Sequence, residues 1–303
     1  MDLYLPVAEL SVDLLLLLAL GAGVGFLSGV FGVGGGFLIT PLLIFIGIPP
    51  AVAVGTAAPQ VLASSVSGVL AHLERGTVDI KMGLVLTAGG FVGSAAGVLV
   101  FRWLLGIGQI ETVIALGFVL LLAVVGTLML IESTRALLAS GQAPARPPQR
   151  ARRHLLLHRL PLKMRFTESR LYISALLPLA VGAVVGLLAA VLGVGGAFVM
   201  IPAMIYLIGM PTRIVVGTSL LQVAFVTALT TFLHAYNNKT VDIVLAVLLI
   251  LGGVVGAQLG ARVGTALRGE QLRVLFAILV LLVCVRLGWD LVAEPSDLYS
   301  LAP

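Results

Sequence analysis

FGVGGGFLITP, from Phe31 to Pro41, places a run of glycines between two apolar segments, and LGVGGAFVMIP, from Leu192 to Pro202, does the same 161 residues later. Glycine lacks a Cβ and readily adopts positive φ, so the chain can leave one helix and enter the next sharply at such a run. The repeated stretch therefore predicts two equivalent helix breaks, one in each half of the chain.

The sequence around these stretches is strongly apolar. Hydrophobic residues make up 60% of its 303 residues and charged residues 10%, and its mean hydropathy is +1.17. This composition excludes a soluble domain with a polar surface. Apolar runs of about 20 residues recur along nearly the whole chain, each long enough to cross a bilayer as a helix. We therefore expect an all-α, polytopic membrane bundle.

The similarity between the halves extends well beyond the glycine runs. Equivalent residues lie 161 to 163 positions apart, which indicates duplication of one ancestral unit. The matching residues are Gly55 and Gly217, Thr56 and Thr218, Gln60 and Gln222, His72 and His234, and Thr77–Ile80 and Thr240–Ile243.

Five apolar segments are expected in each half. They cover residues 12–31, 37–47, 52–72, 80–101 and 110–131, and then 172–192, 198–209, 213–235, 242–262 and 272–291. The second of each set has about a dozen residues, too few to cross alone, so it is either a short crossing or a re-entrant half-helix. Five crossings give the halves opposite orientations, the inverted-repeat design of many secondary transporters.

A basic stretch separates the halves. Eight of the 18 Lys and Arg residues lie between Gly141 and Arg170. The positive-inside rule places this stretch in the cytoplasm, and five crossings per half then put both termini outside. Its part RRHLLLHRLPLKMRF could lie along the anionic inner leaflet, so we expect lipid rather than nucleic acid as its partner. The expected units are a first membrane repeat at 1–138, a basic linker at 139–170 and a second membrane repeat at 171–303.

The short helix after each glycine run is expected to begin inside the bilayer. A helix start presents unpaired N–H groups and the positive end of its dipole, which favour an anion. Two such starts near the midplane would hold a small anion between them. The candidate binding residues in the runs are Gly34, Gly35, Gly36, Gly195, Gly196 and Ala197. Close helix packing is the alternative, and it is the expected role of Gly25, Gly29, Gly93, Gly97, Gly186, Gly256 and Gly260.

Polar side chains on the following helix complete the candidate site. Thr56 and Gln60 lie four residues apart on one helix face, as do Thr218 and Gln222. Their uncharged donors would suit an oxyanion without trapping it, although interhelical hydrogen bonding would explain them equally well.

Histidine and aspartate occupy the ends of these helices. His72 and His234 are expected at the membrane interface, with proton handling as the alternative. Asp79 and Asp242 follow threonine at helix starts, where capping is the expected role.

The paired GVGGG…P and GVGGA…P motifs, each followed by GT…Q, resemble the TauE/SafE family of membrane proteins. This resemblance implies export or permeation of sulfite, sulfonates or related small organic anions. We expect a secondary carrier in a bacterial cytoplasmic membrane, working by alternating access and without a cofactor or metal. An anion channel is the alternative, and the sequence leaves a homo-oligomer open. A membrane-embedded enzyme is disfavoured because HExxH, GxSxG and clustered metal ligands are missing from the sequence.

Overall fold

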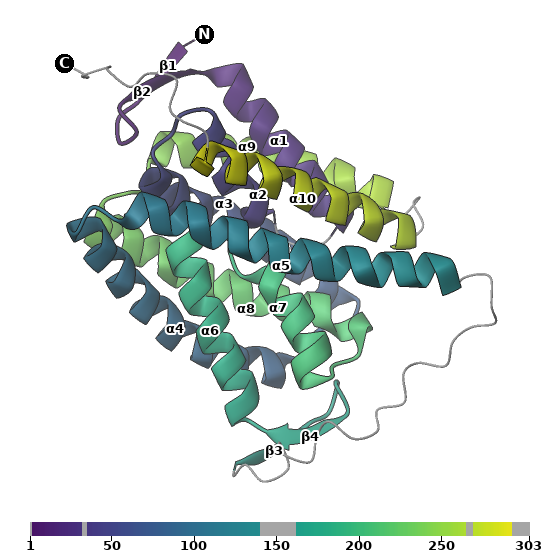
Figure 1. Ribbon diagram of the computed structural model, residues 1–303. Coiled ribbons are helices and arrows are strands. Elements are labelled where there is room, and N and C mark those ends of the chain that lie inside the picture. Colours follow the sequence, from purple (N-terminus) through teal and green to yellow (C-terminus); the bar gives the residue numbers. More distant parts are fainter. Residues whose placement is uncertain (1, 32–34, 140–161, 265–268, 293–303) are drawn as a thin grey trace.

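The computed structural model describes residues 2–31, 35–139, 162–264 and 269–292. Helices form most of these ranges (Figure 1), so the expected all-α polytopic bundle is confirmed. The helices of the first half are α1 Leu14–Phe31, α2 Gly36–Phe45, α3 Pro50–Glu74, α4 Ile80–Gly106 and α5 Ile110–Ala139. Those of the second half are α6 Leu176–Leu192, α7 Ala197–Ala203 continued by the π-helix η2 Met204–Ile208, α8 Thr212–Leu233 continued by the π-helix η3 His234–Asn238, α9 Ile243–Gly264 and α10 Gly269–Val292.

A short antiparallel hairpin precedes the first helix of each half, which the sequence patterns did not predict. The strands are β1 Asp2–Leu5 with β2 Leu10–Asp13, and β3 Lys163–Phe166 with β4 Leu171–Ser174. The first segment of each half therefore becomes helical later than expected, at Leu14 and Leu176. Four-residue strands that merge into an apolar helix give no separate signal.

The hairpins belong to the repeat. Leu5 and Phe166 are 161 residues apart and fully buried, and Glu9 and Arg170 adopt the same positive φ, 54° and 51°. The predicted linker boundary at residue 170 falls inside the second hairpin. Residues 140–161 of the basic linker lie outside the described ranges.

The two halves exchange packing partners. Helix α1 packs along α9, and its counterpart α6 packs along α4, while α3 lies on α8 and α5 on α10. Close approach in the α1–α9 and α4–α6 pairs depends on the predicted packing glycines, because a Cβ would meet backbone of the other helix at Gly25, Gly93, Gly97, Gly186, Gly256 and Gly260. That role is confirmed for these six glycines.

The first helices of the two halves start from opposite ends of the molecule. In Figure 1 the β1–β2 hairpin lies at one end, above α1, and the β3–β4 hairpin lies at the other, below α6. This placement agrees with halves of opposite orientation, although the inverted relation itself stays a prediction.

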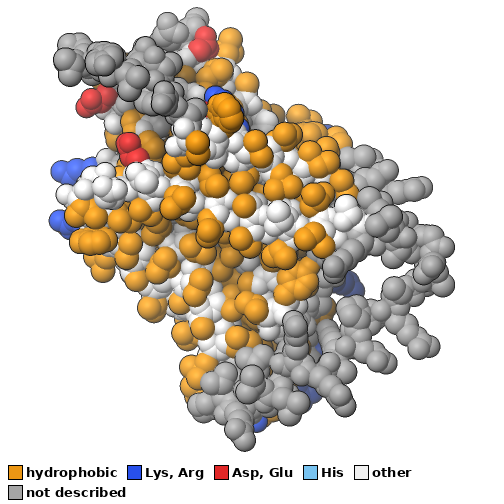
Figure 2. Space-filling model, in the orientation of Figure 1, with side chains coloured by type: hydrophobic (Ala, Val, Ile, Leu, Met, Phe, Trp, Pro, Cys, Tyr) orange, Lys and Arg blue, Asp and Glu red, His pale blue; other side chains and the backbone are white. Residues whose placement is uncertain are grey.

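Six helices are long and apolar enough to cross a membrane: α3, α4, α5, α8 with η3, α9 and α10. The other helices contain apolar segments of only 10–17 residues, namely Leu14–Val30 in α1, Gly36–Phe45 in α2, Leu176–Leu192 in α6 and Ala197–Ile208 in α7 with η2. Hydrophobic side chains cover most of the face seen in Figure 2, and the charged side chains visible there lie towards its edges. The structure thus supports an integral membrane protein, and the count of ten crossings stays a prediction.

Two π-helices explain why the repeat offset drifts from 161 to 163. Pro202 and Gly209 are seven positions apart, whereas their counterparts Pro41 and Gly47 are six apart, and η2 fills the longer interval. A π-turn closes with an i→i+5 bond, so it takes up one extra residue without disturbing the helix on either side.

The second change in the repeat offset has the same cause. The interval from His234 to Thr240 is one residue longer than that from His72 to Thr77, and η3 lies within it. Each inserted residue is thus absorbed as a π-turn in the second half.

Candidate functional site

The first glycine run sets the start of α2. Gly35 is the N-cap with a φ of 69°, and its carbonyl oxygen accepts bonds from the N–H groups of Leu38 and Ile39 at 3.1 and 3.4 Å. Positive φ there explains the need for glycine. Gly36 and Phe37, the first residues of the helix, are buried. Gly34 lies outside the described residues.

The second run has the same geometry and is described in full. Helix α6 ends at Gly193, and α7 begins after Gly196, with Gly195 between them. All three glycines have positive φ, at 69°, 72° and 86°. Ala197 and Phe198 at the start of α7 are buried. The predicted helix breaks are therefore confirmed, and both short helices begin in the protein interior.

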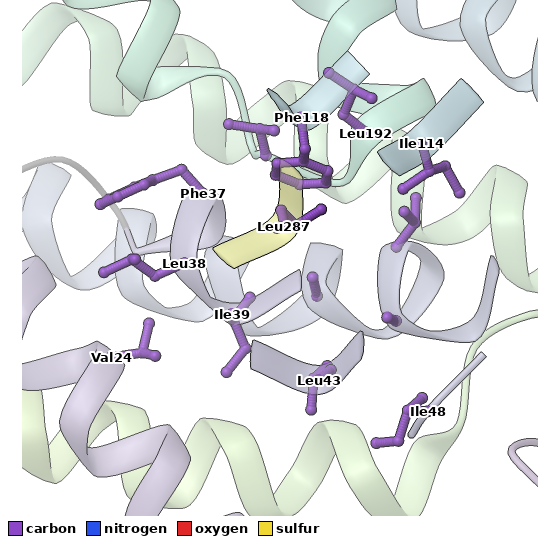
Figure 3. Packing of buried hydrophobic residues seen from close by; sticks show 14 of the residues in the cluster. Val24, Phe37, Leu38, Ile39, Leu43, Ile48, Ile114, Phe118, Leu192 and Leu287 are labelled. Carbon is purple, nitrogen blue, oxygen red and sulfur yellow. The ribbon is translucent and has the colours of Figure 1, made fainter. Parts of the chain in front are cut away.

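The two helix starts meet. Phe37 and Phe198 stack with their ring centroids 4.7 Å apart and their planes at 11°, and both rings meet Phe276 edge-on. A methyl group on Gly36 would lie 2.6 Å from the carbonyl oxygen of Val194. Figure 3 shows Phe37 in the surrounding core, to which helices of both halves contribute. The N-terminal end of each helix carries the positive end of the helix dipole, so two positive helix ends face one region.

Val61, which the sequence reasoning missed, lies between the two breaks. A methyl group on Gly36 would lie 2.5 Å from its Cγ2, and one on Gly195 would overlap its Cγ1. Val61, Ala197 and Val223 form one small buried cluster. Val61 and Val223 are equivalent in the repeat, and that equivalence was the signal available. Valine methyl groups thus fill the space between the two helix breaks, which we call the centre.

Gln60 and Gln222 precede these valines and carry polar groups without partners. Both side chains are 1% exposed. Within the described part of the chain, neither Oε1 nor Nε2 of Gln60 has a hydrogen-bond partner, and Oε1 of Gln222 has none either. An unsatisfied buried polar group costs roughly 1–3 kcal/mol. Such groups need an explanation, and a polar ligand is one.

Each glutamine packs over a glycine of the other half. A methyl group on Gly253 in α9 would lie 3.0 Å from Nε2 of Gln60, and one on Gly90 in α4 would lie 2.9 Å from Nε2 of Gln222. Gly90 and Gly253 are themselves equivalent in the repeat. The absence of a side chain at these glycines leaves the space that each carboxamide occupies.

The threonines of the candidate site hold the two halves together. Thr56 Oγ1 accepts a bond from the N–H of Asp242 at 3.0 Å, and Thr218 Oγ1 accepts one from the N–H of Asp79 at 2.9 Å. All four residues are buried. These bonds are the interhelical alternative considered for the threonines, and a part in binding stays a proposal.

The two histidines have different surroundings. His72 is partly buried, with Nδ1 2.8 Å from Thr77 Oγ1. His234 is fully buried, its Nε2 lies 2.9 Å from the Ala190 carbonyl oxygen, and Nδ1 lies 2.9 Å from the Asn238 amide nitrogen. A ring that donates at one nitrogen and accepts at the other is neutral. His234 thus binds a carbonyl group in the last turn of α6, just before the second glycine break.

Comparison with known proteins identifies the family of the chain. The family model described as sulfite exporter TauE/SafE matches residues 17–287. The chain belongs to this family. The match spans both helix breaks and both glutamines of the TauE/SafE chain, which confirms the resemblance carried by the doubled motif.

Several curated proteins are similar to this TauE/SafE chain. A probable membrane transporter protein of Xylella fastidiosa strain 9a5c is 32% identical over 284 residues, which cover 90% of the chain and 95% of the relative. The probable membrane transporter protein YunE of Bacillus subtilis is 25% identical, over 92% of the chain and 98% of its own length. Sulfite exporter TauE/SafE family protein 1 of Arabidopsis thaliana is 38% identical over 78 residues, 26% of the chain and 17% of that protein. No solved structure gives a significant match. Family membership supports a membrane transporter.

Proposed function

We propose that this TauE/SafE chain is a secondary transporter that exports a small oxyanion of the sulfite or organosulfonate class by alternating access. The observation that carries the proposal is the pair of buried carboxamides of Gln60 and Gln222. Among the described residues both polar atoms of Gln60 and Oε1 of Gln222 have no hydrogen-bond partner, and each glutamine directly precedes a valine of the cluster at the meeting helix starts. Carboxamide N–H groups and helix N-termini both donate to anionic oxygens.

The proposed binding residues come from both halves. Helix starts contribute backbone N–H groups, and the side chains contribute uncharged donors. They are Gly34, Gly35, Gly36, Thr56 and Gln60 with Gly195, Gly196, Ala197, Thr218 and Gln222.

Charge favours an anion over a cation in this region. Among the described residues the buried carboxylates are Asp79 and Asp242. Asp79 accepts bonds from two backbone N–H groups and the Ser169 hydroxyl, and Asp242 accepts bonds from three backbone N–H groups. The partial positive charge of two helix starts, equivalent to roughly half a unit each, therefore acts on a centre lined by uncharged residues. Because this charge is partial, an anion can be held and still released.

A carrier fits the filled centre better than an open channel. Val61 contacts both breaks, and Val61 and Val223 pack with Ala197. An anion can reach the carboxamides only after these methyl groups part, which requires the helices to move. Among the described residues, the same centre offers binding groups and no nucleophile paired with a base, so we propose transport and not catalysis.

Flux measurements on the purified protein test the proposal. Liposomes containing the protein are loaded with sulfite, and efflux is followed with and without a proton gradient. We expect saturable sulfite efflux that methanesulfonate inhibits in competition, and a loss of at least tenfold in Gln60→Leu and Gln222→Leu. Thr127→Val is the control, because Thr127 is exposed on α5 and bonds to its own helix. Efflux that does not saturate would indicate a channel, and normal efflux in both leucine variants would refute the site.

Localisation and topology belong to the same proposal. We propose that the protein lies in a bacterial cytoplasmic membrane, with the linker at 139–170 inside and both termini outside. Single cysteines at Glu9 and in the linker, in a Cys284→Ala background, would be labelled with an impermeant maleimide on intact cells. Labelling at Glu9→Cys alone is expected. Labelling in the linker and not at residue 9 would reverse the assignment.

A further inference from the structure

Two buried aspartates occupy equivalent positions at the start of α4 and α9. Asp79 and Asp242 are 1% and 0% exposed. Oδ1 of Asp79 accepts the N–H of Met82 at 3.0 Å, and Oδ1 of Asp242 accepts the N–H groups of Val244 and Leu245 at 3.1 Å. The predicted capping role is confirmed, and it uses only one oxygen of each carboxylate.

The second oxygen of each carboxylate binds the hairpin of the other half. Oδ2 of Asp79 accepts two bonds from Ser169, one from its N–H at 3.0 Å and one from its hydroxyl at 2.5 Å. Oδ2 of Asp242 accepts the N–H of Val7 at 3.0 Å. Ser169 and Val7 lie in the turns of the β3–β4 and β1–β2 hairpins. Capping alone does not require either contact.

The backbone of each aspartate makes a third link across the halves. The N–H of Asp79 donates to Thr218 on α8, and that of Asp242 donates to Thr56 on α3. We call Asp79, Ser169 and Thr218 the first clasp, and Asp242, Val7 and Thr56 the second clasp. Apart from the capping bonds, every bond named in the clasps joins the first half to the second.

The clasps lie on either side of the proposed site. Their hairpins are at opposite ends of the molecule (Figure 1). Thr218 is one helical turn before Gln222 on α8, and Thr56 is one turn before Gln60 on α3. One half cannot shift against the other at either end without breaking the bonds of the clasp there. Bonds to a buried carboxylate are among the stronger hydrogen bonds in proteins.

We propose that the two clasps are the gates of the transporter and that they open alternately, one at each end of the site. This inference rests on the proposed transport function. Opening a clasp frees the hairpin and the Thr-bearing helix at that end, so that the glutamine one turn away becomes accessible. The other clasp stays bonded and seals the opposite end.

The clasps are unequal. Ser169 adds a hydroxyl bond to the first clasp, whereas Val7 at the second clasp has no hydroxyl. The first clasp therefore needs one more bond to break. The resting protein is accordingly expected to open more often at the end that carries the β1–β2 hairpin.

A cysteine at the centre reports on both gates. Val61→Cys in a Cys284→Ala background places one thiol between the breaks, and an impermeant maleimide is added to one face of oriented proteoliposomes at a time. Asp79→Asn should raise labelling about tenfold from the β3–β4 face alone, the factor expected for one or two lost charge-assisted bonds. Asp242→Asn should raise it from the β1–β2 face alone. A purely structural loss would raise labelling from both faces or prevent folding.

Two milder variants keep the test decisive if the asparagine variants do not fold. Ser169→Ala removes the additional hydroxyl and should raise labelling from the β3–β4 face several-fold. Val7→Thr keeps the branched shape, adds a hydroxyl to the second clasp and should lower labelling from the β1–β2 face. Tyr172→Phe, which removes an exposed hydroxyl from the β3–β4 hairpin, is the control. Equal effects at both faces, or none, would overturn the gate proposal.

This test is independent of the transported anion. Labelling needs no sulfite, so one-sided labelling without any sulfite flux would retain the gates and refute the transport function. Saturable sulfite flux with labelling that no clasp variant alters would refute the gates and retain the function.

Discussion

Phe37 and Phe198 stack face to face although 161 residues separate them, with 4.7 Å between their ring centroids. Each is the second residue of a short helix that follows a glycine break. The pair therefore brings the starts of the two short helices into contact. Val61 lies against Gly36 and Gly195 at these helix starts, and Gln60 directly precedes it in the chain.

Leucine at the glycine breaks should abolish transport. Gly196 has a φ of 86°, and a Cβ there would lie 2.8 Å from Val185 Cγ1. A left-handed conformation costs a residue with a Cβ about 1–2 kcal/mol, and the contact adds to this. Gly35→Leu and Gly196→Leu are expected to insert into the membrane and to show no sulfite efflux.

Gly23→Leu is the matched control for these variants. Gly23 lies in α1, and apart from its chain neighbours and the nearby backbone of its own helix no atom comes within 4 Å of the position that its Cβ would occupy. Its efflux should equal that of the unaltered protein. Normal efflux in Gly35→Leu and Gly196→Leu would show that the breaks are not part of the site.

Replacement of the buried glutamines should separate stability from function. Gln60→Leu removes a carboxamide that has no partner among the described residues, so the free energy of unfolding should stay level or rise by about 1 kcal/mol. Sulfite efflux should nevertheless fall at least tenfold. Thermal unfolding in detergent and efflux are measured on the same preparation. A fall in stability would mean that the carboxamide has a structural partner and would weaken the binding assignment.

Alanine at the packing glycines should destabilise the bundle. A Cβ on Gly93 would overlap the carbonyl group of Ala183 on α6. The helices can only move apart, and we expect Gly93→Ala to lower the free energy of unfolding by about 1–3 kcal/mol. Gly288→Ala in α10 meets no atom within 4 Å and should raise it by about 0.5–1 kcal/mol. Equal melting temperatures for the two variants would contradict the packing role.

Deletion of one residue from η2 should be tolerated. Removing Leu207, which is 55% exposed, restores the spacing found between Pro41 and Gly47 and should convert the π-turn to regular α-helix. Leu43 lies in the equivalent interval of α2, and that interval contains no extra residue. Deleting Leu43 therefore shifts the buried side chains of α2 out of register. We expect the first variant to be monodisperse and folded by circular dichroism, and the second to aggregate. The opposite result would show that the π-turn is not an absorbed insertion.

The sequence alone was enough to predict the helices, the repeat and the two breaks. Membrane helices need long apolar runs, and a break that requires positive φ needs glycine, so both features are visible in the residue types. Gly35, Gly193, Gly195 and Gly196 accordingly adopt positive φ. The capping of α4 by Asp79 was also readable, since an N-cap bond is local in the chain.

Only the tertiary structure showed what these local features contact. Val61 is an ordinary apolar residue in the sequence, and its place between Gly36 and Gly195 follows from how α3 packs against both breaks. Likewise, the bonds from Asp79 to Ser169 and from Asp242 to Val7 join residues 90 and 235 positions apart. Residue type and spacing carry local conformational preference, whereas contacts between distant segments depend on the packing of the whole chain.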